Sequence, residues 1–244
     1  MDHQRDGLGV SASHQALLWL GGPDPAFSTV VQLAHFDGTN GSTTFTNSCP
    51  RGNTMINNAG STISTAQSVF GGASLRIDNS VGAGIFGSAL SDYQFGSNDW
   101  TIEFRFRPDA VALINIYDGR VGSANAACPT IYTLANGTLI YFVSNADRIT
   151  SASGVITAGA WQAIAVSRVS GTTRMFVNGS QVGSNYTDGT NYNVSTQVSV
   201  GSKFTTGQKN AYYDELRVSN GAFGAGAGRY AANYTPAAIP FPNY

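Results

Sequence analysis

The stretch WTIEFRFRP, residues 100–108, indicates most clearly how this chain of 244 residues folds. Every second side chain in it is large and apolar: Trp100, Ile102, Phe104 and Phe106. This period of two predicts a β-strand with one buried face and one wet face, and Pro108 ends the strand because it lacks an N–H group. On the wet face we expect Glu103 and Arg105 to form a solvated ion pair.

Short strands joined by tight turns follow this stretch. TIYTLANGTLIYFVS, residues 130–144, has two β-rich runs around Asn136-Gly137, a pair that readily adopts the positive φ angles of a type I′ turn. WQAIAVSRVSGTTRMFVNGSQVG, residues 161–183, turns at Ser170-Gly171 and again at Asn178-Gly179, which predicts a three-stranded meander. Trp161 opens the first strand of this meander, as Trp100 opens its own strand, and we expect both indoles in the core.

The whole chain follows this pattern. About a dozen strands are expected, no helix-length apolar periodicity separates them, and 29 glycines supply the turns. The sequence therefore predicts an all-β fold of two packed antiparallel sheets, a sandwich or jelly roll. Its core is expected to hold Ile102, Phe104, Phe106, Ile164, Val166, Leu216 and Val218.

Composition excludes several functions. With 13 Lys and Arg against 14 Asp and Glu, the chain lacks the basic surface that nucleic acid requires. The apolar run ALLWL, residues 16–20, is too short for a signal-peptide core or a membrane span, so we expect no membrane partner. Cys49 and Cys128 allow either one disulfide or two thiols, and the sequence does not decide between them.

The first 29 residues differ from the remainder of the chain. Residues 1–29 lack alternation and are predicted to be an arm, followed by one domain over 30–244 with an extended, proline-containing tail from Gly221. GGPDP, residues 21–25, is interpreted as a hinge. The arm is either a disordered terminus or a docking segment that packs on this domain or on a partner. Its candidate contacts are Leu17, Leu18, Trp19 and Leu20.

Five motifs together resemble a known family. In chain order they are FDGTNGSTTFTNS, SVFGGASLRID, FGSNDWTIEFRFRP, WQAIAVSRVSGTTRMFVNGSQVG and AYYDELRVSNGAFGAGAGRYAANYTP. This order is similar to that of concanavalin A-like jelly rolls of the laminin-G-like type, especially those of bacteriophage structural proteins, over about residues 30–240. The last motif departs from the compact form, because GAFGAGAG adds small residues before Arg229.

The resemblance implies a non-enzymatic protein on the virion surface, as a capsid decoration or a tail or fibre component, assembled in the host cytoplasm. It would be present in several copies or as a homo-oligomer. The arm would bind other virion proteins, with Trp19 as the aromatic anchor.

An alternative function is that of a carbohydrate-binding module or adhesin, which would bind surface glycans through loops at one end or through the concave face of a sheet. Aromatic rings beside planar polar groups suit sugars, although the same residue types are ordinary in exposed turns. The candidate contacts are Tyr117, Asp118 and Arg120 in one loop and Tyr186, Asp188 and Tyr192 in another.

Catalysis and cofactors are not expected. A glycoside hydrolase needs two carboxylates across the scissile bond, and the Glu-x-Asp-x-x-Glu pattern of glucanases with this fold is absent. The histidines His3, His14 and His35 are too scattered for a zinc site or a triad. Asp214 alternates with Leu216, so it is predicted to point inward and accept backbone N–H groups from a turn. The alternative role of Asp214, as a Ca²⁺ ligand of the kind that some laminin-G domains use, lacks a dense acidic cluster.

Overall fold

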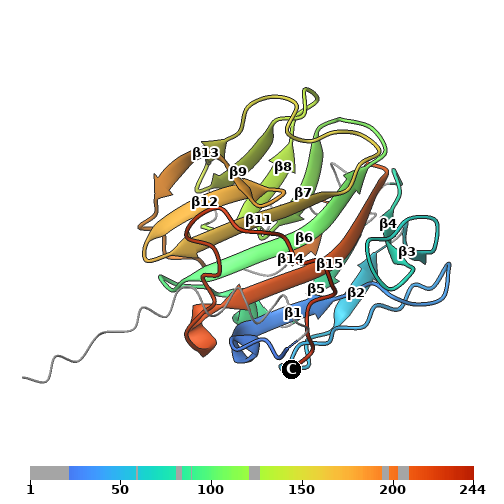
Figure 1. The fold of residues 1–244 in the computed structure, drawn as a ribbon, viewed down its shortest axis with the longest axis horizontal. Helices are drawn as coiled ribbons and strands as arrows, with labels where there is room; N and C mark the ends of the chain where they lie inside the picture. Colours follow the sequence, from blue (N-terminus) through green and yellow to red (C-terminus); the bar gives the residue numbers. More distant parts are fainter. Residues whose placement is uncertain are drawn as a thin grey trace, which may run out of the picture.

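The computed structural model describes residues 22–58, 60–80, 84–88, 90–120, 127–193, 198–202 and 209–244. In this part of the chain two antiparallel sheets pack face to face (Figure 1), as predicted. Three short 3₁₀ helices accompany them: η1 (Phe27–Thr29), η2 (Leu90–Tyr93) and η3 (Gly221–Phe223).

The eight-stranded sheet has the order β13-β12-β11-β6-β15-β4-β3, with β1 pairing beside β15. Its strands are β1 (Val30–Ala34), β3 (Ser61–Ser64), β4 (Ser74–Ile77), β6 (Trp100–Pro108), β11 (Gln162–Val169), β12 (Thr172–Val177), β13 (Ser180–Thr187) and β15 (Ala211–Asn220). The seven-stranded sheet has the order β10-β9-β8-β7-β14-β5-β2. Its strands are β2 (Met55–Asn58), β5 (Gly84–Gly87), β7 (Ile114–Asp118), β8 (Thr130–Thr133), β9 (Leu139–Val143), β10 (Ala146–Thr150) and β14 (Val198–Val200).

Turn chemistry sets the meander β11-β12-β13 as predicted. Ser170 and Gly171 both have positive φ angles, 49° and 72°, and so do Asn178 and Gly179, 51° and 80°. These pairs match the backbone that a two-residue hairpin needs. The Asn136-Gly137 turn between β8 and β9 is different, because only Gly137 has a positive φ, 78°. The hairpin is therefore confirmed, but its type I′ turn is not.

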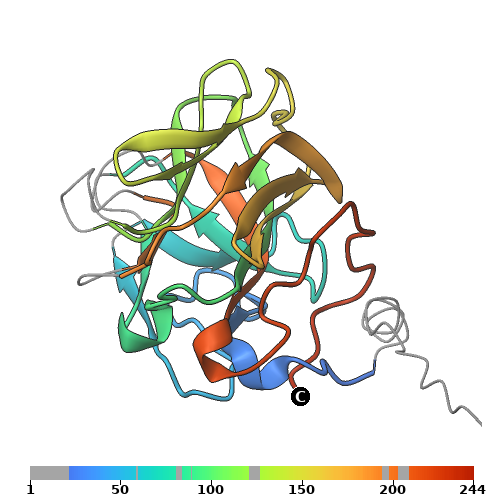
Figure 2. The ribbon, with the colours of Figure 1, turned by 90° about the vertical axis from the view of Figure 1, so that its left-hand side faces the viewer.

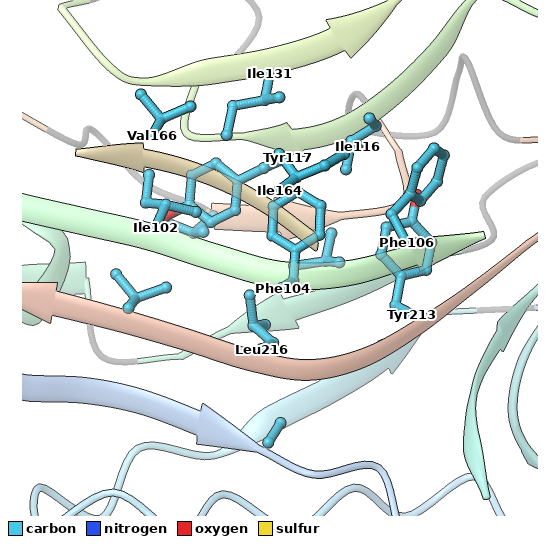
Figure 3. Close-up of a cluster of buried hydrophobic side chains, with 14 of the residues drawn as sticks. Ile102, Phe104, Phe106, Ile116, Tyr117, Ile131, Ile164, Val166, Tyr213 and Leu216 are labelled. Atoms are coloured by element: carbon cyan, nitrogen blue, oxygen red, sulfur yellow. The ribbon is translucent and has the colours of Figure 1, made fainter. Parts of the chain in front are cut away.

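The core between the sheets contains all seven predicted residues, and each is buried. Figure 3 shows side chains from both sheets meeting there, with Phe104 and Ile164 of one sheet facing Ile116 and Ile131 of the other. Trp100 is fully buried at the start of β6. Trp161 is half-buried just before β11, so it contributes less to the core than predicted.

The outer face of the eight-stranded sheet is also covered. The C-terminal tail, residues 224–244, runs across it without regular secondary structure, as the dark red segment in Figures 1 and 2 shows. Tyr230 and Tyr234 stack at 3.7 Å between ring centroids and both contact Phe176 of β12 edge-on. Phe241 packs in a second apolar cluster with Val30 and Leu33 of β1. The central strands of this sheet, β6, β11 and β15, are therefore largely buried on both faces.

The covered face changes the role of Glu103. The predicted solvated pair with Arg105 is wrong, because Glu103 is only 3% exposed. Its carboxylate accepts hydrogen bonds from Arg217 Nε at 2.9 Å and from the Tyr230 hydroxyl at 2.7 Å. Arg105 instead donates to the backbone carbonyl of Ala237 in the tail. The alternation of β6 thus separates two buried environments, one apolar and one charged.

Asp24 joins this buried charge. It accepts hydrogen bonds from Arg217 Nη1 and Arg229 Nη1, each at 3.1 Å. We call Asp24, Glu103, Arg217 and Arg229 the ion cluster. Burial alone would raise the pKa of Asp24, but the charges of Arg229 and Arg217 hold this pKa below its ordinary value. Asp24 is thus buried within the folded body, although the sequence placed it in a hinge.

A β-bulge in β15 alters the predicted direction of Asp214. The register shifts between Asp214 and Arg217, and Glu215 has a φ of 50°. Asp214 therefore lies opposite Arg105, on the tail side of the sheet, and not on the core face with Leu216. The predicted hydrogen bonds are confirmed, because the Asp214 carboxylate accepts the N–H groups of Val69 at 2.7 Å and Phe70 at 3.2 Å. Burial raises its pKa to about 7.

The bulge also places Glu215 where it holds the end of the tail. The Glu215 carboxylate lies 2.7 Å from His35 Nδ1 and accepts the backbone N–H of Phe241 at 2.8 Å. His35 Nε2 lies 2.7 Å from the side-chain oxygen of Asn243. Burial alone would lower the pKa of His35, but Glu215, Asn243 and Asp37 raise this pKa to about 9. A charged imidazolium thus joins β1, β15 and the tail.

This arrangement predicts that the protein loses stability as the pH rises from about 6.5 to 9. His35 has a higher pKa folded than unfolded, so its contribution is complete below the unfolded value of 6.5 and disappears as the pH passes about 9. The shift corresponds to a free energy of unfolding on the order of 3 kcal/mol. Urea denaturation between pH 6 and 9, below the pH at which tyrosines of the unfolded chain titrate, measures this change. H35Q should abolish it, and an equal slope in H35Q would contradict the assignment to His35.

Candidate functional site

The outer face of the seven-stranded sheet carries the most suggestive set of side chains. Strand register places five residues in one row across β10, β9, β8, β7 and β14: Asp147, Phe142, Thr130, Asp118 and Ser199. A second row crosses β10, β9, β8 and β7: Thr150, Ile140, Tyr132 and Asn115. Residues directly opposite one another in paired strands share a face. We call these two rows the sheet platform.

Two aromatic side chains stand at the centre of the sheet platform. Tyr132 and Phe142 are half-buried, their ring centroids are 6.5 Å apart, and the rings meet at 64°. The Tyr132 hydroxyl donates to Asp147 Oδ1 at 2.7 Å, and burial together with Asp147 raises the pKa of this tyrosine. Because the rings are not coplanar, a flat ligand can stack on one of them while meeting the edge of the other.

The guanidinium of Arg120 packs against the ring of Phe142. Its guanidinium binds the Asp118 carboxylate through two atoms, with Nε 2.9 Å from Oδ1 and Nη2 2.7 Å from Oδ2. The guanidinium carbon lies 4.8 Å from the centre of the Phe142 ring. Asp118 also accepts the backbone N–H of Arg120 and the hydroxyl of Thr130. The charges of Asp118 and Arg120 thus compensate each other at the border of the aromatic pair.

Tyr117, predicted to contact a sugar from an exposed loop, lies elsewhere. It is buried in the core between the sheets, among the residues that Figure 3 draws. The register of β7 against β8 shifts between Asn115 and Tyr117, so the tyrosine turns inward while Asp118 stays on the sheet platform. Tyr117 therefore offers no face to a ligand, and of this predicted loop only Asp118 and Arg120 border the site.

The second predicted loop is mainly structural. Asp188 and Tyr192 are fully buried, and the Asp188 carboxylate accepts the hydroxyls of Tyr192 and, at 2.6 Å, Thr173. Tyr192 in turn shares a hydrogen bond with the core residue Tyr141, 2.5 Å between oxygens. We call Asp188, Tyr192 and Tyr141 the end lock. Burial and the neighbouring Asp188 raise the pKa of Tyr192, which stays neutral.

Tyr186 is the exception in that loop, because it is half-buried. Its ring lies beneath Arg148 of β10, with 5.3 Å from the guanidinium carbon to the ring centre. This contact joins the edge strands of the two sheets, β13 and β10. Unlike Asp188 and Tyr192, Tyr186 has accessible surface, so it stays a candidate for contact with a ligand.

The two predicted loops are brought together at one end of the sandwich. Gly119 donates its N–H to the carbonyl of Pro129, and Asn193 donates to that of Ala127. The Cys128 thiol, buried between them, donates to the carbonyl of Asn193. The Cys49 thiol donates to the carbonyl of Val31, so each cysteine sulfur has its own backbone acceptor.

Tyr132 and Phe142 are the residues that the sequence interpretation missed. The stretch TIYTLANGTLIYFV was used only to predict a hairpin. Its signal was that apolar and aromatic side chains occupy both faces of β8 and β9, although only one face of a sandwich sheet meets the core. The described residues contain no group of His, Cys, Asp or Glu arranged to hold a metal ion. The predicted docking residues Leu17, Leu18, Trp19 and Leu20 lie outside the described ranges.

Comparison with known proteins places the fold. The family profile described as the Concanavalin A-like lectin/glucanases superfamily matches residues 86–226. No curated protein sequence matches the chain significantly. Among the described residues, no helix is both long and apolar enough to cross a membrane.

Several solved structures share the fold at low sequence identity. The binding domain of Paraclostridial Mosquitocidal Protein 1 superposes with a TM-score of 0.60 at 14% identity over 80% of this chain and 49% of that chain. The receptor binding domain of botulinum neurotoxin type G gives 0.56 at 14%, over 78% and 47%. Domain 4 of AbnA, a GH43 extracellular arabinanase from Geobacillus stearothermophilus in complex with arabinotriose, gives 0.55 at 14%, over 79% and 92%. The chain spans about half the length of the two toxin binding domains.

The end lock leads to a prediction about Asp188. D188N should lower the free energy of unfolding by about 3 kcal/mol, because Arg168, 3.6 Å from the Asp188 carboxylate, would keep a buried charge without its partner. Urea denaturation near pH 7 measures the loss. The exposed Asp147 provides the control, since D147N should change stability by less than about 0.5 kcal/mol. Equal effects of the two variants would contradict a structural role for Asp188.

Proposed function

The chain belongs to the Concanavalin A-like lectin/glucanases superfamily, and we propose that it is a non-enzymatic carbohydrate-binding domain whose ligand surface is the sheet platform. One observation carries the proposal: the half-buried rings of Tyr132 and Phe142 lie beside the exposed carboxylate of Asp147. An aromatic ring stacks on the C–H face of a sugar, and a carboxylate accepts the sugar's hydroxyl groups.

The C-terminal tail covers the outer face of the eight-stranded sheet, which makes the sheet platform the more accessible surface for a ligand. The eight-stranded sheet has its outer face covered by residues 224–244, including the stacked Tyr230 and Tyr234. A ligand there would have to displace those contacts and uncover the ion cluster. The sheet platform requires no such displacement at Tyr132, Phe142 and Asp147, which already have accessible surface.

The carboxylates of the sheet platform support binding without hydrolysis. A glycosidase needs one acid that can be protonated and a second carboxylate available to the sugar or to water. Asp118 accepts four hydrogen bonds from Arg120 and Thr130, which leaves it poorly placed to act as a nucleophile or base. A domain of similar fold, domain 4 of AbnA, was solved with arabinotriose bound.

Replacing Phe142 tests the proposed surface. F142A should reduce the affinity for a glycan found by array screening by at least tenfold, because the ring supplies the stacking face. Isothermal titration calorimetry measures the affinity, and chromatography of the mixture checks that the glycan is not cleaved. Y212A is the matched control: Tyr212 is a half-buried ring under the guanidinium of Arg76, on the eight-stranded sheet. Equal losses in both variants, or turnover of the glycan, would contradict the proposal.

We further propose that a larger particle, a bacteriophage virion, displays several copies of this domain. The sequence resemblance to phage structural proteins supports this role, with Leu17, Leu18, Trp19 and Leu20 binding other virion proteins. The place where the chain enters the domain also supports display on a particle. Asp24 donates its N–H to the carbonyl of Tyr244 at 2.8 Å, and its carboxylate pairs with Arg217, so the chain enters the domain on the tail side. The sheet platform belongs to the other sheet and would face away from the particle.

Deleting residues 1–22 tests the attachment. The truncated chain keeps Asp24, and its melting temperature should lie within a few degrees of that of the full chain. Particles that assemble in the presence of the truncated chain should nevertheless not incorporate it. Quantitative immunoblotting of purified particles measures incorporation, and F142A, which leaves the arm intact, should incorporate normally. Full incorporation of the truncated chain would mean that the jelly roll itself carries the docking surface.

A further inference from the structure

We propose that the sheet platform accepts an uncharged sugar residue and discriminates against acidic sugars such as sialic and uronic acids. This inference rests on the proposed function and adds the chemical class of the ligand. It follows from the charges that border Tyr132 and Phe142, because an acidic sugar needs a cation that is available to pair with its carboxylate.

Arg120 is a cation in contact with the ring of Phe142, and its guanidinium already has a carboxylate partner. Asp118 occupies its Nε and Nη2 atoms in a two-point ion pair, and both side chains are largely buried. A sugar carboxylate would have to compete with Asp118 for this guanidinium. Separating a buried pair leaves one charge without a partner, so the competition is unfavourable.

Arg148, the next cation along β10, is directed to another part of the surface. Its Nε donates to the carbonyl of Val143 at 3.3 Å, and its guanidinium lies over the ring of Tyr186 on β13. Two segments that continue from the site along the chain add no charge, because residues 121–126 read VGSANA and residues 194–197 read VSTQ. The segment after β14, residues 203–208, reads KFTTGQ and lies outside the described residues. None of these groups therefore provides a second anchor for an acid.

Asp147 is the one exposed charged side chain among the described residues of the two rows, and it is negative. It lies directly opposite Phe142 in the register of β10 with β9 and accepts the hydroxyl of Tyr132. A sugar stacked on either ring would therefore place a carboxylate substituent near that of Asp147. Two carboxylates a few ångströms apart, at about 4 Å for example, repel each other even in water, whereas the hydroxyl groups of a neutral sugar can donate hydrogen bonds to Asp147.

Matched glycan pairs test the inference on the full chain. The probes are a sialylated N-glycan before and after enzymatic removal of sialic acid, and an oligogalacturonate with its fully methyl-esterified form. At 0.05 M salt we expect the neutral member of the bound pair to bind at least tenfold more tightly than the acidic member. D147N should reduce this preference by about fivefold to tenfold by removing the repulsion. D78N changes a half-buried carboxylate beyond the end of β4 and should leave the preference unchanged.

The outcomes separate this inference from the proposed function. If the acidic member binds as tightly as the neutral one and F142A weakens both, the sheet platform binds glycans but the inferred ligand class is wrong. If D147N leaves the preference unchanged, Asp147 does not set it and the inference fails. If no glycan binds, or F142A has no effect on binding, the proposed function fails and the inference fails with it.

Discussion

The buried charge of Arg217 is the constraint on which the arrangement of this chain depends. Arg217 lies on β15, 1% exposed, with its guanidinium bonded to Glu103 of β6 and Asp24 near the start of the domain. The ring of Phe241 covers the guanidinium at 3.8 Å. Removing one member of such a buried pair costs about 3–5 kcal/mol, because the partner charge remains without water. The tail and the first residues of the domain must therefore stay in place.

This constraint divides the two sheets by function. The eight-stranded sheet has an apolar core on one face and a charged, aromatic layer on the other, and the tail covers the middle of that second face. The ion cluster fixes where the tail lies on the sheet. Arg229 of the tail pairs with Asp24, and the hydroxyl of Tyr230 donates to Glu103. Among the described residues, no comparable layer covers Tyr132 and Phe142 of the seven-stranded sheet, which are only half-buried. One sheet is thus covered by the tail, and the proposed ligand surface lies on the other.

The sequence predicts whatever depends on neighbouring residues. The alternation of Trp100–Pro108 and the glycine turns at Ser170-Gly171 and Asn178-Gly179 are local signals, and the strands, turns and core they predicted are confirmed. Glu103 was misplaced because residues more than a hundred positions away cover it. Asp214 was misplaced because a bulge in β15 shifts the alternation by one residue, and no residue type in that strand marks a bulge. Tyr117 was expected in an exposed loop, but it lies in β7, where a bulge turns it into the core.

The bulges and the end lock also explain why the candidate site lies on strands and not on the predicted loops. Tyr141 and Phe142 are consecutive residues of β9, so their side chains point to opposite faces. Tyr141 is held in the core by Tyr192, which Asp188 holds in turn, and this fixes the backbone beneath Phe142. On the outside, the Asp118–Arg120 pair limits the movement of the Phe142 ring. A ring restrained from both sides would lose little entropy on binding the proposed ligand, which would lower the cost of binding a single sugar residue.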